Sequence, residues 1–233
     1  MRQTPSTPSR PDRRPGSVLL LALLTAVLVV TGSGAAQALA TPRPTVRFAH
    51  VTPDRAPGYQ GQVTCDPKER PGTVALRSLL RATYGKANSG GIVRSCSTGG
   101  RSEHKEGRAY DWMLDANRAS DKAMADAFLA WLTGPDRNGY RGGNAQRLGV
   151  QYVIWNKRQW STWDKRWIAY RGASPHTDHV HISLTWDGAM KRTSWWDGHE
   201  VLKFDHGPCV RTAGTLAPRY TKVNYTPCPK PRP

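Results

Sequence analysis

The chain lacks several features that define whole classes of proteins. No C-x-x-C pair occurs among its four cysteines, so a metal site built from cysteine is disfavoured. No internal repeat is visible, and there is thus no sign of a repeat architecture. Its longest apolar run, residues 18–30, is shorter than the roughly 20 residues that span a bilayer. These absences leave one ordinary folded domain as the simplest expectation.

The first forty residues resemble an export signal. Arg10, Arg13 and Arg14 precede the apolar run, and small residues follow it. Cleavage after Ala38-Leu39-Ala40 fits this pattern best, and an uncleaved anchor of marginal length is the alternative. We therefore predict a signal peptide over residues 1–40 and a secreted protein, extracellular or associated with the cell wall. We expect no stable membrane insertion after cleavage.

Acidic residues are scarce, since 17 Asp and Glu face 34 Lys and Arg and the net charge is +17. Such a charge favours anionic polymers. Outside a cell these are wall teichoic acids, acidic lipids or acidic glycans rather than chromosomal DNA, so no specific nucleic-acid partner is expected. In the alternative interpretation, scattered basic side chains only keep a secreted protein soluble.

The four cysteines follow the predicted signal, where oxidising conditions let disulfides persist. Three pairings are possible for four cysteines. Closing the shortest loops favours Cys65 with Cys96 and Cys209 with Cys228, each pair removing conformational entropy from the unfolded chain.

About 190 residues remain after the signal, which suits a single domain. We predict a Pro/Arg-rich linker or loosely docked arm at 41–62, a folded domain at 63–204, and a disulfide-stapled, proline-rich extension at 205–233. Periodicity and caps predict two helices, one capped by Thr73 and ending at Gly85, the other capped by Ser120 and ending at Gly134. The predicted strands are 108–114, 150–155 and 179–185, with a further strand or hairpin at 195–204. This mix predicts an α+β fold with a small central antiparallel sheet flanked by helices.

Tryptophans alternate with basic residues between positions 155 and 167. No single helical or strand period accounts for all of these indoles. We expect Trp155, Trp160 and Trp163 to bind substrate along a surface groove, because aromatic faces stack on sugars or peptides. The alternative is that they are half-buried packing beneath a long loop.

Two short stretches, residues 102–111 and 176–181, together contain a complete set of zinc ligands. A catalytic zinc takes three nitrogen or oxygen ligands from the protein and leaves the fourth position to solvent. His104, Asp111 and His181 can supply these three for one zinc ion. Glu106 and Asp115 are poorer candidates. Gly107, which has no side chain, lets the loop that bears His104 turn back sharply.

The last stretch also offers acid–base groups. Residues two apart in a strand share a face, so His179 projects beside His181 while Val180 enters the core. His179 is then within reach of an attacking water, and its pKa suits proton transfer near neutrality. Asp178 is a second candidate base, although period two places it on the opposite face.

The motif S-x-H-x-x-G-x-A-x-D, followed by H-x-H, resembles the zinc metallopeptidase group that includes lysostaphin, the D-alanyl-D-alanine metallopeptidases and the hedgehog signalling domain. The resemblance covers roughly residues 65–185 and implies the same fold and the same three zinc ligands. It also implies that Arg94 is the arginine that orients the substrate. D-alanyl-D-alanine enzymes carry Glu where this chain has Asp178, whereas lysostaphin-like members use the histidine that corresponds to His179. The general base is therefore left open between these two residues.

These observations predict a secreted zinc peptidase that acts on peptidoglycan peptides, as a carboxypeptidase or an endopeptidase. The alternative is a non-catalytic cell-wall-binding protein with a structural zinc site, since hedgehog shows that such a site does not prove turnover. A phosphoesterase or nuclease is weaker. A two-histidine enzyme of that kind needs a pair of H-x-S/T motifs, and only residues 181–183 provide one.

Overall fold

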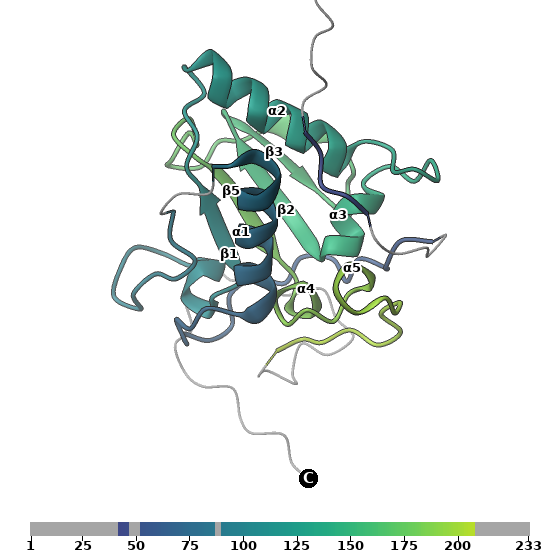
Figure 1. Ribbon diagram of the computed structural model, residues 1–233. Helices are drawn as coiled ribbons and strands as arrows, with labels where there is room; N and C mark the ends of the chain where they lie inside the picture. Colours follow the sequence, from purple (N-terminus) through teal and green to yellow (C-terminus); the bar gives the residue numbers. More distant parts are fainter. Residues whose placement is uncertain (1–41, 47–51, 87–89, 208–233) are drawn as a thin grey trace, which may run out of the picture. The chain divides into compact units, whose positions relative to one another are not determined.

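A computed structural model describes residues 42–46, 52–86 and 90–207 (Figure 1). No helix within these residues is long and apolar enough to cross a membrane. The predicted signal, residues 1–40, lies outside the described part of the chain. The same holds for the predicted pair of Cys209 and Cys228.

The described residues form a five-stranded sheet in the order β1-β5-β2-β3-β4, and every neighbouring pair is antiparallel. The strands are β1 (Ala109–Trp112), β2 (Val150–Trp155), β3 (Arg158–Ser161), β4 (Trp167–Ala169) and β5 (Val180–Leu184). The three strands predicted with definite bounds correspond to β1, β2 and β5. With the helices described next, the predicted α+β fold with an antiparallel sheet is confirmed.

The helices are α1 (Pro71–Tyr84), α2 (Ala119–Thr133), α3 (Gly143–Leu148), α4 (Trp186–Ala189) and α5 (Ser194–Asp197), with a 3₁₀ turn η1 (Glu103–Glu106). Both long helices occur where they were predicted and end at the predicted Gly85 and Gly134, but their predicted N-caps are wrong. The N-cap of α1 is Arg70 and that of α2 is Arg118, and neither side chain caps its helix. The Thr73 hydroxyl instead donates to the carbonyl of Gly107.

Helices α1, α2 and α3 lie on one side of the sheet (Figure 1). Their apolar side chains meet those of the strands in one core, which takes Val180, Ile182 and Leu184 from β5. Because strand side chains alternate between faces, His181 and Ser183 project from the other face. The sheet thus has one face buried under α1–α3 and an opposite face that carries the candidate ligand of β5.

The strand or hairpin predicted for residues 195–204 is wrong. Residues 194–197 form the short helix α5, and Gly198, with φ of 81°, follows it. Trp195 is buried and packs against Trp131 of α2, with ring centroids 5.7 Å apart. The indole is buried by packing under α2. The apolar residues of this segment therefore contribute to helix packing and do not indicate a strand.

The arm predicted at 41–62 is not loose where the structure describes it. Asp54 is 1% exposed and accepts hydrogen bonds from Ser194 and Val201. The buried guanidinium of Arg108 donates to the carbonyl oxygens of Gln60 and Gly61. Buried polar groups of the domain are satisfied by this segment, so residues 52–62 belong to the folded unit rather than to a linker.

The predicted disulfide between Cys65 and Cys96 is present. It joins the segment before α1 to the loop that leads into η1. The bond therefore tethers the chain on the N-terminal side of η1.

Candidate metal centre

Two of the three predicted metal ligands face each other across neighbouring strands. The register of β1 and β5 pairs Asp111 with His181, and directly opposed residues of an antiparallel pair project from the same face. The distance from Asp111 Oδ1 to His181 Nδ1 is 2.9 Å. Strand pairing thus brings together two residues that are 70 positions apart in the chain.

The third candidate ligand, His104, comes from η1, and the turn at Gly107 sets the position of this segment. Gly107 has a φ of 68°, and a Cβ atom there would lie 1.8 Å from the carbonyl oxygen of Lys68. Only glycine fits this backbone, as predicted. The Nδ1–H of His104 donates to the carbonyl of Ile92 over 3.0 Å. This bond leaves Nε2 free as a ligand atom and fixes the ring.

The three side chains form the group of the described residues that could hold a metal ion. His104 Nε2 lies 3.1 Å from Asp111 Oδ1 and 3.3 Å from His181 Nδ1. Ligand atoms about 2.0–2.2 Å from an ion at the corners of a tetrahedron are roughly 3.3–3.6 Å apart. The observed spacings therefore need to open by only a few tenths of an ångström.

The protonation states of this group suit a metal ligand set. Burial raises the pKa of the Asp111 carboxyl, but the imidazoles of His104 and His181 beside it outweigh this effect and hold that pKa far below its ordinary value. Burial lowers the pKa of His181. A carboxylate and a neutral imidazole at neutral pH are the forms that bind divalent metals.

His179 and Asp178 lie at different distances from the centre. His179 Nε2 is 3.5 Å from Asp111 Oδ1, and on the other side of the ring Nδ1–H donates to Asp178 Oδ1 over 2.8 Å. The side chain of Asp178 is 74% exposed. Burial raises its pKa, whereas the hydrogen bond from His179 lowers it, and the net shift is downward. The His179 imidazole therefore faces the candidate metal centre, and the Asp178 carboxylate bonds to the side of the ring that points away from it.

Sequence reasoning assigned no role to three other side chains beside the centre. The ring of His176 lies 4.7 Å from that of His179 and 5.7 Å from that of His181. Burial lowers the pKa of His176 to about 4, so it is neutral. The H-x-x-H-x-H spacing of residues 176–181 is the sequence feature that could have indicated His176 as part of this site.

Tyr152 and Glu103 are the other two side chains beside the centre that sequence reasoning did not identify. The ring of Tyr152 stacks on that of His181 at 5.5 Å, and its hydroxyl donates to Glu103 Oε2 over 2.7 Å. Glu103 is 3% exposed and also accepts a hydrogen bond from Tyr59. No sequence spacing indicated this contact, because it arises from the pairing of β2 with β5.

The other residues predicted to contact substrate differ in exposure and in position relative to the candidate metal centre. Arg94 is exposed, and its backbone N–H donates to the carbonyl of His104, which places it next to the centre. Trp163 is 38% exposed and lies 5.9 Å from Tyr59. The substrate-binding role predicted for Trp160 is wrong, since its side chain is 1% exposed within the core. Trp155 belongs to the helix-covered face, away from the three ligands.

Glu106, rated a poorer ligand on sequence, has a structural role instead. It is fully buried, as is Arg108, with which it forms an ion pair. Its other oxygen accepts hydrogen bonds from the backbone N–H groups of Val63 and Thr64. We expect Glu106→Gln to lower the free energy of unfolding by about 3–5 kcal/mol, because it leaves the buried Arg108 charge without its partner. Urea denaturation measures this loss.

Glu69→Gln is the matched control. Glu69 pairs with Arg77 at the surface, where ion pairs contribute under about 1 kcal/mol. Equal losses for the two variants would contradict the structural role given to Glu106.

Fold and site define an α+β protein with a three-residue candidate metal centre on the sheet face opposite α1–α3. The model of the family described as VldE, C-terminal domain, matches residues 65–181, just over half of the chain, and the protein belongs to this family. The match begins at Cys65 and ends at His181, so it includes all three candidate ligands. Comparison with curated proteins and with solved structures gave no match.

Proposed function

We propose that the protein is a secreted zinc-dependent peptidase that acts on peptidoglycan peptides, as a carboxypeptidase or an endopeptidase. One observation carries the proposal. Three ligand atoms from η1, β1 and β5 converge within 3.3 Å of one another, and the ring of His179 faces the same carboxylate. A metal site with a spare imidazole beside it can support hydrolysis of an amide, because the metal activates water and the imidazole transfers the proton.

The choice of zinc follows from the donor atoms. Two imidazole nitrogens and one carboxylate oxygen form a ligand set that suits zinc, and three protein ligands leave one coordination position open. A zinc ion supplies Lewis-acid polarisation of a carbonyl group and makes water more acidic.

The protein's own residues then divide the remaining work. His179 accepts a proton at Nε2 from the attacking water and returns it to the leaving amine, while Asp178 holds the ring and stabilises its charged form. Arg94, exposed beside His104, binds a carboxylate of the substrate. Tyr152 stacks on His181 and limits the rotation of that ring.

Three sequence features support a wall peptide as substrate. The first is the resemblance of the H-x-x-G-x-A-x-D and H-x-H motifs to lysostaphin and the D-alanyl-D-alanine metallopeptidases. The second is the predicted export signal, and the third is the strongly positive net charge, which remains after removal of residues 1–40 and favours the anionic polymers of a cell wall.

Digestion of purified cell walls tests the proposal. We expect the zinc-loaded protein to release amino groups or D-alanine from walls of at least one type, and mass spectrometry of the fragments to identify the bond. Treatment with a chelator should stop the release, and added zinc should restore it. If a zinc-loaded sample releases nothing from any wall type, the proposed activity is wrong.

A further inference from the structure

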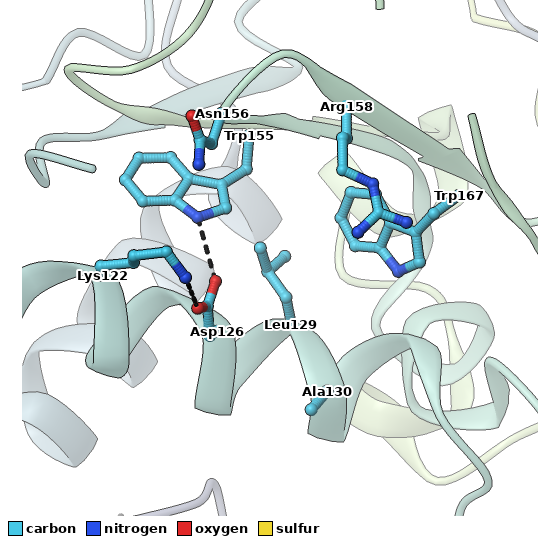
Figure 2. A pocket seen from close by; sticks show the side chains of 8 residues that line it. All are labelled: Lys122, Asp126, Leu129, Ala130, Trp155, Asn156, Arg158 and Trp167. Atoms are coloured by element: carbon cyan, nitrogen blue, oxygen red, sulfur yellow. Dashed lines mark hydrogen bonds and ion pairs between the residues drawn. The ribbon is translucent and has the colours of Figure 1, made fainter. Parts of the chain in front are cut away.

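A pocket lies between α2 and the β2–β3–β4 edge of the sheet (Figure 2). Its volume is about 290 Å³, close to the lower limit of about 300 Å³ for small-molecule sites. The residues that line it are Lys122, Asp126, Leu129, Ala130, Trp155, Asn156, Arg158 and Trp167.

This pocket is separate from the candidate metal centre. Ile154 pairs with His181 across β2 and β5, so these two side chains share a face and Trp155, one residue on, points to the other. Arg158 pairs with Trp155 and lies on the same face as that indole. The sheet therefore stands between the pocket and the three ligands.

One wall of the pocket presents a fixed carboxylate. The indole Nε1–H of Trp155 donates to Asp126 Oδ1 over 3.2 Å, and Lys122 forms an ion pair with the other oxygen (Figure 2). The side chain of Asp126 is 47% exposed, so its oxygens can still accept hydrogen bonds from hydroxyl groups. With Asn156 nearby, this wall offers both donors and acceptors.

The opposite wall presents a cation. The guanidinium of Arg158 lies 5.3 Å from the ring centroid of Trp167, and Figure 2 shows the apolar Leu129 between this pair and the Trp155–Asp126 pair. Among the described residues, no carboxylate lies within ion-pair distance of Arg158. The N–H edge of a guanidinium can form two parallel hydrogen bonds with a carboxylate.

We propose that this pocket binds an acidic saccharide, namely a sugar ring that bears a carboxylate. The ring's C–H groups pack on the half-buried indole of Trp167, its hydroxyls bond to Asp126 and Asn156, and its carboxylate pairs with Arg158. Small-molecule sites combine apolar walls with a few converging polar groups in this way. The inference does not depend on catalysis at the metal centre, because the pocket lies across the sheet.

Two matched sugars test it. Methyl β-glucuronide carries a carboxylate where methyl β-glucoside carries a hydroxymethyl group, and the two are otherwise the same. We expect the glucuronide to shift the NMR signal of the Trp155 indole N–H with millimolar affinity, and the glucoside to bind at least about tenfold more weakly. Equal affinities, or no shift of this signal with either sugar, would overturn the proposal.

Variants and a third ligand sharpen the test. Arg158→Gln should reduce glucuronide affinity about tenfold, to the level of the glucoside, whereas Arg166→Gln, at an exposed arginine outside the pocket, should not change it. Unchanged backbone NMR signals in each variant show that the fold is retained. N-acetyl-alanine provides a carboxylate without a sugar ring. If it binds as well as the glucuronide, the pocket is a general carboxylate site and the saccharide proposal is wrong.

Discussion

Replacing Asp111 with Asn lowers the affinity for zinc by about 100- to 1,000-fold and abolishes peptide hydrolysis. Zinc sites with four ligands bind with a free energy of about 10–16 kcal/mol, so one ligand accounts for roughly 2.5–4 kcal/mol. Asparagine has the same shape but lacks the charge, and Asp111 Oδ1 is the atom that lies within 3.1 Å of both His104 Nε2 and His181 Nδ1. Competition with a chromophoric chelator measures the affinity.

Asp115→Asn is the control for this experiment. Asp115 lies four residues further along the chain and is exposed, and it accepts a hydrogen bond from the backbone of Asn117. This variant should bind zinc as the wild type does. If Asp111→Asn also binds zinc with unchanged affinity, the three residues do not form the metal centre and the proposed function fails with them.

Replacing His179 with Ala reduces turnover by about 100- to 10,000-fold, the range expected for a general acid–base group, while zinc affinity stays within a few-fold of wild type. Its ring faces Asp111, but it is not among the three grouped ligands. The two readouts separate proton transfer from metal binding. Hydrolysis of a wall-derived peptide gives the first, and chelator competition gives the second.

Asp178→Asn should reduce turnover less than His179→Ala, because the carboxylate orients the imidazole and does not face the centre. A larger loss for Asp178→Asn would assign the base to the carboxylate. A loss of zinc affinity in His179→Ala as large as that in Asp111→Asn would make His179 a fourth ligand. The site would then be closed, as in structural zinc sites, and the wall-binding alternative would be preferred.

Sedimentation with insoluble walls examines that alternative directly. If the protein only binds walls, His179→Ala binds as the wild type does and Trp163→Ala binds more weakly, and neither releases fragments. Trp163 suits this comparison because it is 38% exposed beside Tyr59, so its removal leaves the core intact.

Patterns with a short period predicted local structure well. The alternation in residues 180–184 predicts a strand with His181 on one side and Val180, Ile182 and Leu184 in the core, and the structure has this arrangement. Gly107 was predicted to let the loop that bears His104 turn back sharply, and the structure gives this residue a positive φ beside the Lys68 carbonyl. Such features depend on backbone geometry within a few residues.

Features that depend on packing against distant segments were not predictable. Trp160 belongs to the same tryptophan-rich stretch as Trp163, yet one is in the core and the other is exposed. Residues 52–62 have no apolar periodicity because they dock through buried polar groups such as Asp54. Neither outcome has a local signature, since both are decided by which surface the segment meets.

The sequence by itself identified the three side chains that the structure groups as a candidate metal centre, because donor atoms and their spacing within each motif are chemical properties of short segments. The tertiary structure alone decided which of two neighbouring groups faces the centre, since the orientation of His179 and Asp178 depends on where β5 pairs with β1. It also decided that Trp155 and Arg158 line a pocket on the opposite face. Strand register sets both outcomes, because shifting a strand by one residue exchanges its two faces.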